Sequence, residues 1–457
     1  MAATGQNPPS RDACDGLHQA LEGFDAARAG EELHSLVREL YPICRSITGE
    51  GLRRSLRILS RVAPLEVREV PSGTKVFDWV VPPEWTLRAA RLVGPGGEVV
   101  CDAARSSLEV LNYSAPFRGR VSRRDLEAHL HSIPEQPSLV PYRTSYYRPD
   151  WGFCLPHARR TALAEGEYQV LVDSTLADGS MSYGELVVPG AETGEVVVSA
   201  HCCHPSLAND NCSGMAISAT LARLLSGLEP RYTYRFLFVP GTIGTIAWLA
   251  LHEEEARRIE HGLVLACLGD PGRMNYKRTR RGDAEIDRVV SHVLAASGQD
   301  YRVRDFTPYG YDERQYGSPG FNLAVGALTR TPHGEYAEYH TSADDPSFVR
   351  PDRLADSLRR CLEILLVLEG NRVYLNLLPK CEPQLGKRGL YGSVGGSSHA
   401  AARQMAMLWL LNLADGSHSL LDVAERSRVS FGDLREAARA LEAAGLLRVA
   451  GREEARP

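Results

Sequence analysis

Apolar and polar positions change their spacing along the chain, and each change marks a different kind of structure. From 31 to 62, apolar residues recur three and four apart in two stretches around a polar break at 46–51, which predicts two amphipathic helices. From 65 to about 150, short strand-like runs are interrupted by Pro, Gly and Ser, with one helical candidate at 123–131. The pattern therefore predicts a small β-rich module inserted after the first helices.

From residue 168 onward, strand-like and helical runs alternate, which indicates an α/β domain with a mixed sheet and helices on both faces. After about 397, three helical runs are followed by a short strand, as in a winged helix. We interpret the Gly-rich run before them, 392–398, as a linker, and residues 1 to 25 as a loose lead-in. The predicted domains are 25–64 with 160–380 (α/β), 65–159 (β-rich) and 385–457 (winged helix).

The α/β part is organised around one stretch, 196–214. The run Val196–Val198 has the β-branched character of a strand covered on both faces, and this strand ends at His201. A polar turn with His204 and Asp210 follows, and helical spacing begins after Ser213. Open α/β sheets carry their chemistry at the carboxyl ends of strands. We therefore expect the functional site here.

Composition restricts the class of protein rather than the activity. The 457 residues contain 43% apolar residues and carry a formal charge of -5, which is ordinary for a globular protein and demands neither a nucleic-acid nor a membrane partner. The ten cysteines show no CxxC pair, so we expect reduced thiols and a cytoplasmic location. Cys202 and Cys203 fit buried structural thiols, with a thiol nucleophile or thiolate ligand as the alternative. No signal peptide or membrane span is predicted.

Imidazoles and carboxylates recur at corresponding places of the predicted sheet. His201 and Asp270 each follow a strand-like run, and Asp210 and His340 lie in polar loops. Nitrogen and oxygen ligands of this kind are the set that catalytic zinc uses. The alternative is that they are helix caps and turn formers, as a loop Asp usually is. Four of them together favour the metal site.

The segment 201–214, HCCHPSLANDNCSG, resembles the His-then-Asp-Asn-x-Ser-Gly segment of zinc aminopeptidases with the bacterial leucyl aminopeptidase fold. More narrowly, the chain resembles a bacterial group of aminopeptidase-like proteins with an inserted β domain and a C-terminal winged helix. The other matching runs are YPICRSITGEGLR (41–53), VFDWVVPPEW (76–85), PYRTSYY and WGFCLPH (within 141–157), PGTIG (240–244), DERQYGSPGFNL (312–323) and EYHTSADD (338–345). They span nearly the whole chain.

The resemblance implies a set of metal ligands. His201 and Asp270 would bind one zinc ion, Asp210 would bridge to a second, and His340 would bind that second ion. His204 has no counterpart in the wider pattern, so it either replaces a missing ligand or hydrogen-bonds a carboxylate. Cys203 stands where that pattern has an acid that orients the first histidine.

The chain departs from the wider pattern at PGTIG. The related enzymes carry two consecutive glutamates there, a general base and a zinc ligand, whereas this chain has Gly241 and Thr242. With only Asp210 and His340 left for a second metal, one zinc is expected and a second stays an open alternative. Zinc alone can lower the pKa of bound water to about 7, whereas loss of a general base costs ~10²- to 10⁴-fold in rate. The alternative is a catalytically impaired binding or scaffold protein.

Polar residues in the matching loops are candidates for the missing roles. Asp312, Glu313 and Glu338 are candidate bases, and Asp312 or Glu313 could instead hold a substrate amine. Arg314 is a candidate for pairing a substrate carboxylate, and Tyr311 for lining the pocket. The alternative for 312–314 is a solvated charge cluster, and for the tyrosine ordinary packing.

We therefore expect a zinc-dependent aminopeptidase-like hydrolase that cleaves an amide next to a free amino group on a small peptide or an aminoacylated metabolite. The resemblance also points to biosynthetic settings such as polysaccharide pathways. The β module and winged helix would limit substrate size or make homo-oligomer contacts. A DNA-reading winged helix is the second alternative; eight arginines balance eight acidic residues over 401–457, which speaks against it.

Overall fold

The computed structural model describes residues 11–390, 398–451 and 454. The expected linker at 392–398 lies almost wholly outside the described residues, as do the first ten residues of the lead-in. It divides into two compact units, Met1–Leu362 and Glu363–Pro457, which are treated separately below. Within the described ranges, every helix is too short or too polar to cross a bilayer.

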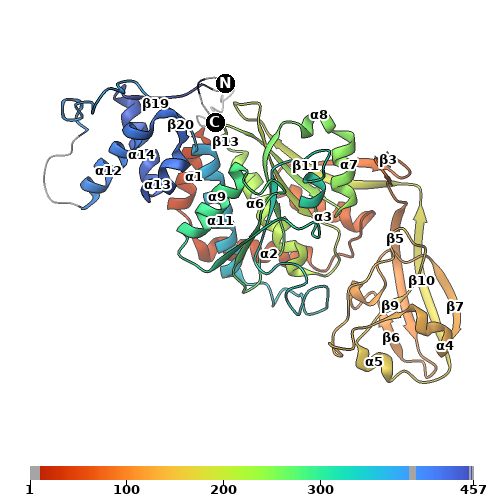
Figure 1. Ribbon diagram of the computed structural model, residues 1–457. Helices are drawn as coiled ribbons and strands as arrows, with labels where there is room; N and C mark the ends of the chain where they lie inside the picture. Colours follow the sequence, from red (N-terminus) through yellow and green to blue (C-terminus); the bar gives the residue numbers. More distant parts are fainter. Residues whose placement is uncertain (1–10, 391–397, 452–453, 455–457) are drawn as a thin grey trace, which may run out of the picture. The chain divides into compact units, whose positions relative to one another are not determined.

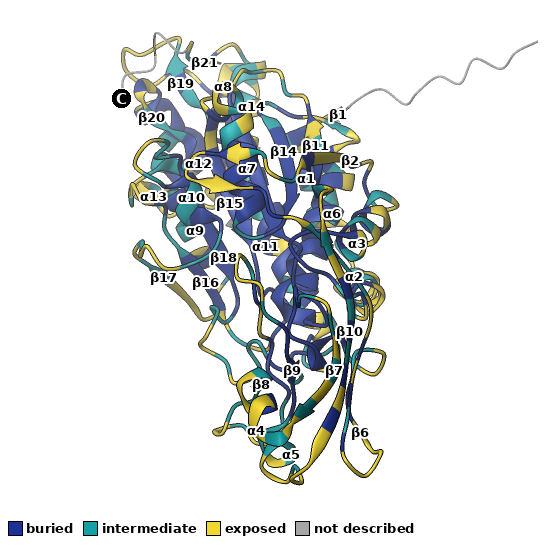
Figure 2. Ribbon diagram, turned by 90° about the vertical axis from the view of Figure 1, so that its right-hand side faces the viewer, coloured by how far each residue is buried: buried dark blue, intermediate teal, exposed yellow. Residues whose placement is uncertain are grey.

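A mixed sheet of eight strands forms the centre of the first unit (Figure 1), in the order β17-β16-β18-β15-β12-β14-β11-β2. Figure 2 shows the inner strands as buried along most of their length. The strands are β2 (Glu66–Pro71), β11 (Ser180–Val188), β12 (Glu195–His201), β14 (Thr233–Val239), β15 (Ile259–Leu265), β16 (Met274–Lys277), β17 (Tyr301–Arg304) and β18 (Val325–Thr329).

The four central strands, β18, β15, β12 and β14, run parallel to one another. Their carboxyl ends therefore meet at one edge of the sheet. β12 ends at His201, as the sequence predicts, and all seven of its residues are buried. Gly241 follows β14 and Asp270 follows β15, so the loops that carry the candidate ligands start from neighbouring strands.

Helices pack against this sheet and against each other. α6 contacts β11, β12, β14 and β15, while α2 and α3 pack on α6. The helices of this part are α1 (Ala13–Glu22), α2 (Ala26–Leu40), α3 (Glu50–Ser60), α6 (Gly214–Leu225), α7 (Ile243–Leu251), α8 (Glu253–Ala256), α9 (Glu285–Ala296), α10 (Glu313–Tyr316) and α11 (Pro351–Gly370), which extends into the second unit.

Two helix predictions need correction. Part of the expected loose lead-in is α1, which begins after Asp12, whose side chain accepts a hydrogen bond from the Asp15 amide, and which buries Ala13 and Leu17. The spacing of apolar residues predicts one helix over 246–259, but this helix is broken at His252, whose backbone leaves the helical region at φ -134° and ψ 43°. It is therefore split into α7 and α8, and Ile259 already belongs to β15.

A second, four-stranded sheet lies in the inserted part, in the order β6-β5-β10-β7. Its core is a separate cluster that includes Trp151, Phe153 and Tyr168. The strands and helices are β5 (Glu84–Val93), β6 (Val99–Asp102), β7 (Phe117–Ser122), β10 (Glu167–Ala177), α4 (Arg123–Leu126) and α5 (His157–Thr161). Short pairs of strands are β3 (Lys75–Val76) with β4 (Trp79–Val80), β8 (Leu130–His131) with β9 (Phe153–Cys154), and β1 (Arg11–Asp12) with β13 (Leu228–Glu229).

Two strands pair differently from the sequence pattern. β10 was expected in the α/β sheet, but it forms an antiparallel ladder with β5 from Glu84 to Val93. Conversely, β2 at the start of the expected insert is the edge strand of the main sheet, paired with β11. Strand pairing is non-local, so alternating apolar residues show that a strand exists but not which sheet takes it. The predicted boundaries at 65, 159 and 385 stay predictions.

The described part of the second unit contains, besides the end of α11, a three-stranded sheet, β20-β19-β21, and the helices α12, α13 and α14. α12 and α14 pack on each other, and α13 packs on both. α13 begins at a capping box in which Ser419 and Asp422 satisfy each other's backbone amides. The elements are β19 (Val373–Asn376), α12 (Ser398–Leu413), β20 (Asp415–Ser419), α13 (Leu420–Ser427), α14 (Phe431–Ala443) and β21 (Leu447–Val449). This arrangement is the predicted winged helix.

Candidate active site

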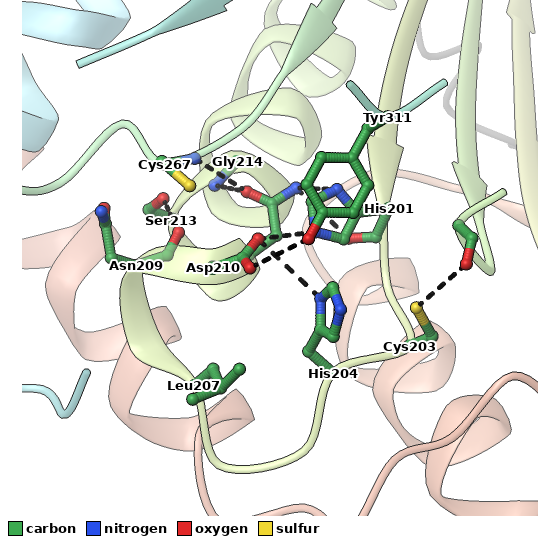
Figure 3. Close-up of polar contacts among 12 residues, drawn as sticks. His201, Cys203, His204, Leu207, Asn209, Asp210, Ser213, Gly214, Cys267 and Tyr311 are labelled. Atoms are coloured by element: carbon green, nitrogen blue, oxygen red, sulfur yellow. Dashed lines mark hydrogen bonds and ion pairs between the residues drawn. The ribbon is translucent and has the colours of Figure 1, made fainter. Parts of the chain in front are cut away.

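Three imidazoles converge on the carboxylate of Asp210 at the carboxyl edge of the main sheet. Figure 3 shows two of them, those of His201 and His204. His201 Nε2 lies 2.7 Å from Oδ1, and His204 Nδ1 lies 3.8 Å from the same oxygen. His340 Nε2 lies 3.0 Å from Oδ2. The Tyr311 hydroxyl donates to Oδ2 over 3.3 Å, and its ring stacks on His201 with centroids 4.3 Å apart. The structure thus brings together His201, His204, Asp210 and His340.

The loop that carries His204 is held from below by a buried arginine. Arg45 is fully buried, and its Nε donates to the His204 carbonyl over 2.9 Å. Its other nitrogens donate to the Leu40 carbonyl, the Ser55 hydroxyl and the Cys212 sulfur. Arg45 thus ties the loop to the helices α2 and α3 and to the segment after Asp210, so it positions His204 without reaching the cavity.

Asp210 is held by its own backbone. It lies in a kinked turn, Ala208–Ser213, whose residues are all buried and in which the Asp210 backbone is not helical (φ -108°, ψ 84°). The amides of Asn209 and Asp210 donate to the two carboxylate oxygens of Asp344, over 2.6 Å and 3.0 Å. This pair of bonds fixes the backbone, so the Asp210 side chain is presented to the imidazoles in one direction.

Burial and charge oppose each other in this cluster. Burial alone would raise the pKa of Asp210, but the imidazoles of His204 and His201, with hydrogen bonds from His201 and His340, hold that pKa well below its usual range. Burial lowers the pKa of His204 well below its usual value, against the pull of Asp210. The arrangement therefore combines an ionised carboxylate with a neutral His204 imidazole, which are the protonation states that a metal ligand needs.

The geometry of three of these groups fits a metal ion. Ligand atoms of His201, His204 and Asp210 all lie within 4.8 Å of one another, and all three residues are buried. Among the described residues, His204 Nδ1 has no hydrogen-bond partner although it is buried. A buried nitrogen left without a partner is costly unless a ligand or ion satisfies it. Two imidazoles and a carboxylate could hold a zinc ion with a position left open.

Asp270, which the sequence also suggests as a ligand, is engaged elsewhere. Its carboxylate accepts hydrogen bonds from the amides of Gly272 and Thr331, the Thr331 hydroxyl and the Asn209 side chain, at 2.6–3.3 Å. None of its described hydrogen bonds involves an imidazole or Asp210. The carboxylate therefore joins the loop after β15 to the loop after β18 by hydrogen bonds. It is not part of the cluster around Asp210.

A cavity of about 570 Å³ opens in front of the cluster. His204, His340, Tyr311 and Arg314 contribute to its lining, so the structure places the candidate substrate residues there. The walls are rich in aromatic rings from the inserted part; one of them, Tyr142, meets both His204 and His340 edge-on with centroids 5.0 Å apart. A mostly aromatic cavity with a few convergent polar groups is typical of small-molecule sites.

The structure places the three candidate bases outside this lining. Asp312 is fully buried, and neither of its oxygens has a hydrogen-bond partner among the described residues; burial raises its pKa to about 6. Glu313 is buried too and pairs with Lys277 Nζ at 2.8 Å. Glu338 offers its backbone carbonyl to Thr341, and its side chain is not part of the cavity wall.

The cysteines beside the histidines do not face the cluster. Figure 3 shows the Cys203 sulfur turned away, toward a carbonyl oxygen, which is that of Gly241 at 3.8 Å. Burial raises the pKa of Cys203 to about 12 and that of Cys202 well above its usual value. Both thiols are therefore neutral, which disfavours the thiolate alternative.

Gly241 is closely approached by the site. A Cβ atom there would come within 3.1 Å of the His201 Cβ and 3.6 Å of the Tyr311 ring. A larger residue would therefore displace the imidazole and the ring that stacks on it. The glycine therefore makes room for the pair of His201 and Tyr311.

Two functional residues were not identified from the sequence. Arg45 stands in the matching run 41–53, but an arginine between apolar residues gives no sign that it will be buried under a histidine loop. Arg143 lines the cavity from the run PYRTSYY, and only the fold brings that run to the site. A backbone hydrogen bond of 2.7 Å from Tyr142 to the His340 carbonyl joins the two loops.

Comparison with known proteins decides the family. A family model described as "Domain of unknown function (DUF4910)" matches residues 34–371, and a winged helix-turn-helix model matches 372–449. The chain belongs to the DUF4910 family. A relative from Clostridium acetobutylicum, named "Putative polysaccharide biosynthesis protein with aminopeptidase-like domain", is 47% identical over 93% of this chain and 98% of its own length.

Solved structures place the fold of this DUF4910 chain among the aminopeptidases. A "putative peptidase" from Clostridium acetobutylicum is similar over 96% of this chain and all of its own, with a TM-score of 0.90 and 44% identity. A zinc aminopeptidase from Bacillus subtilis aligns over 74% of this chain and 94% of its own with TM-score 0.54 and 15% identity. An M28 peptidase precursor from Shewanella amazonensis aligns over 78% of this chain and 96% of its own, with a TM-score of 0.54 and 14% identity. The aminopeptidase-like α/β fold with a winged helix is thereby confirmed.

Proposed function

We propose that this DUF4910 protein is a zinc-dependent hydrolase that cleaves an amide bond of a small peptide or an aminoacylated metabolite. One observation carries the proposal: His201, His204 and Asp210 point ligand atoms at one another, and His204 Nδ1 is buried without a partner. The fold shared with zinc aminopeptidases supports it. The name of the Clostridium relative supports a place in polysaccharide biosynthesis.

In this proposal one zinc ion is held by His201, His204 and Asp210, and Asp270 is left out because its oxygens are already hydrogen-bonded. When bound, zinc would polarise the amide carbonyl and lower the pKa of a water molecule to about 7. His340 holds the second oxygen of Asp210 at 3.0 Å and so keeps that carboxylate in one orientation.

Two tyrosine hydroxyls complete the chemistry. The hydroxyls of Tyr311 and Tyr339 lie 2.9 Å apart, and both residues line the cavity. Burial raises the pKa of each well above its usual value, so both stay protonated. A phenol has one proton, and Tyr311 donates its own to Asp210 Oδ2, so Tyr311 orients that carboxylate. In this proposal Tyr339, released from its bond to Tyr311, is the hydrogen-bond donor for the oxyanion that forms when water adds to an amide.

Metal analysis of the purified full-length protein tests the proposal. We expect one zinc per chain, and at least tenfold weaker zinc binding in His201→Ala, His204→Ala and Asp210→Asn. His157→Ala, which removes an imidazole in the inserted part, is the matched control. Two metals per chain, or zinc content unchanged in all three variants, would contradict the proposed site.

Gly241 and Thr242 favour a second candidate function, that of an aminopeptidase-like binding protein without turnover. Both residues line the cavity, and neither can act as a base. The two functions differ in one measurement. The zinc-loaded protein is incubated for a prolonged time with a library of dipeptides and N-acyl amino acids. If it binds amides but releases no product, it has the binding function. If it releases product and His204→Ala does not, it is a hydrolase.

A further inference from the structure

The cavity in front of the histidine cluster is positively charged, although the chain as a whole carries a formal charge of -5. Two arginines, Arg143 and Arg314, are part of its lining, and the described lining contains no aspartate or glutamate side chain. Of the three candidate bases near this wall, Asp312 is sealed beneath it and Glu313 pairs with Lys277, while the half-buried Glu338 is not part of the lining. The cavity is therefore equipped to meet negative charge.

Both arginines lack a carboxylate partner within the described residues. Arg314 is half-buried, and its Nε is fully enclosed without a hydrogen-bond partner. Asp312 lies near it, but no ion pair joins the two. Arg143 is exposed at the rim, and its one described side-chain hydrogen bond goes to the carbonyl of Tyr142 at 3.0 Å. An enclosed guanidinium nitrogen without a partner is costly, and an incoming anion would satisfy it.

The cavity lining offers no carboxylate partner to a free amine. An ammonium group taken out of water needs a carboxylate or several acceptors to offset its desolvation. The side-chain polar groups that line the cavity are instead guanidiniums, imidazoles, phenols and the hydroxyls of two threonines. Four of the phenols hydrogen-bond in pairs, Tyr142 with Tyr146 at 3.0 Å and Tyr311 with Tyr339 at 2.9 Å.

We propose that the cavity recognises its substrate through an anionic group, a carboxylate or a phosphate, held by Arg314 and Arg143, and that it does not read a free amine. This inference rests on the proposed amide hydrolysis and specifies its substrate class: an N-acylated acid or an acylated phosphate ester small enough for about 570 Å³. It departs from the free amino group that the sequence resemblance implies. The planar guanidinium accepts either anion through paired hydrogen bonds.

The test uses four probes that share one phenyl ring and differ in charge. N-acetylphenylalanine carries the anion alone, phenylalanine amide the amine alone, and N-acetylphenylalanine amide neither; phenyl phosphate carries the other anion. Dissociation constants are measured by calorimetry on the full-length protein, before and after zinc is removed with a chelator. Binding is thus measured independently of turnover. A protein that hydrolyses no amide but still binds the anions would contradict the proposed hydrolase and support the anion site.

We expect N-acetylphenylalanine to bind at least tenfold tighter than its amide, because one charge-assisted pair contributes that much. Phenylalanine amide should bind no better than the uncharged probe. Arg314→Gln and Arg143→Gln should each remove most of the advantage, whereas Arg148→Gln, an exposed arginine of the same loop outside the cavity wall, should retain it. Because Arg143 is exposed, its variant keeps the test valid if Arg314→Gln does not fold.

The relative affinity of phenyl phosphate and N-acetylphenylalanine identifies the preferred anion, and either order supports the anion site. The inference is overturned if phenylalanine amide is the tightest probe, if acid and amide bind equally, or if the two cavity variants behave like Arg148→Gln. It is also overturned if none of the four probes binds at millimolar concentration.

Discussion

Asp312 shows how strongly one buried residue depends on its surroundings. It was a candidate base, but it lies sealed behind His201, beside Thr245, with both oxygens unpartnered among the described residues. Burial raises its pKa from 3.8 to about 6, against the opposing effect of the His201 imidazole. An acid that cannot reach the cavity influences stability rather than turnover.

Asp312→Asn tests this at the level of the residue. Because the folded-state pKa is raised, the folded protein binds the extra proton between about pH 4 and pH 6. Stability from this group is therefore present at low pH and is lost as the pH rises through 6. Relative to wild type, Asp312→Asn should gain up to about 3 kcal/mol in free energy of unfolding between pH 4 and pH 7.5. Urea unfolding of both proteins measures this; a difference that does not change with pH argues against it.

Tyr311 is the residue with most contacts to the cluster, since it stacks on His201 and hydrogen-bonds Asp210. In Tyr311→Phe the ring packing stays and one donor is lost, so we expect kcat to fall about 10²-fold with little change in KM. Tyr309→Phe is the control, because that side chain is 73% exposed. Steady-state kinetics on an amide substrate measures both variants. An equal fall of kcat in Tyr311→Phe and Tyr309→Phe would contradict a catalytic role of Tyr311.

At the scale of elements, the site depends on loops that start from neighbouring parallel strands and are held together by buried polar bonds. Arg45, between α2 and α3, holds the loop of His204, and Asp344 holds the turn of Asp210. Backbone groups in such loops would be costly to bury without these partners. The loops can therefore be rigid without regular secondary structure.

Arg45→Ala should leave the buried His204 carbonyl without its donor and remove one of the two donors to the Leu40 carbonyl, which keeps the Ile43 amide. We expect a loss of about 3 kcal/mol in unfolding free energy and weaker zinc binding, because the His204 loop is released. Arg57→Ala, an exposed arginine on α3, serves as the control. Denaturant unfolding and zinc titration check both effects. If Arg45→Ala folds and binds zinc as tightly as wild type, the hydrogen bonds of Arg45 to the His204 loop are not needed for zinc binding.

At the scale of the whole molecule, the two units carry separate tasks. Every residue of the proposed site lies in Met1–Leu362, and the winged helix lies in Glu363–Pro457. Residues 401–457 contain eight arginines and eight acidic residues, and the matched segment 372–449 contains ten Lys and Arg against seven Asp and Glu, so the winged helix has only a small excess of positive charge for phosphates. The winged-helix fold by itself therefore does not imply DNA binding.

We expect the full-length protein to bind a random 20-base-pair duplex only weakly, with Kd above about 10⁻⁵ M at 150 mM salt. The slope of log K against log salt should be shallow, about -2 or less in magnitude, because few counterions are released. Fluorescence anisotropy across a salt series measures this. A slope of about -6 or steeper would restore the DNA-reading alternative.

The sequence alone determined the local features. β-branched residues at 196–198 and the polar residues after His201 fixed a strand that ends at that histidine. Helical spacing after Ser213 fixed α6, and the alternation of elements fixed the mixed sheet. These features depend on side-chain periodicity and turn chemistry over a few neighbouring residues, so they can be predicted without tertiary structure.

Only the tertiary structure decided which distant groups meet. His204 points at Asp210, Asp270 hydrogen-bonds to Thr331, and Arg143 lines the cavity from the inserted part. No local sequence pattern predicts these contacts. The same holds for β10, which pairs with β5 instead of the main sheet. Burial, hydrogen-bond partners and cavity charge arise from contacts between residues far apart in the sequence. They set the pKa values at the proposed metal site, and the cavity charge is the basis for the proposed anion site.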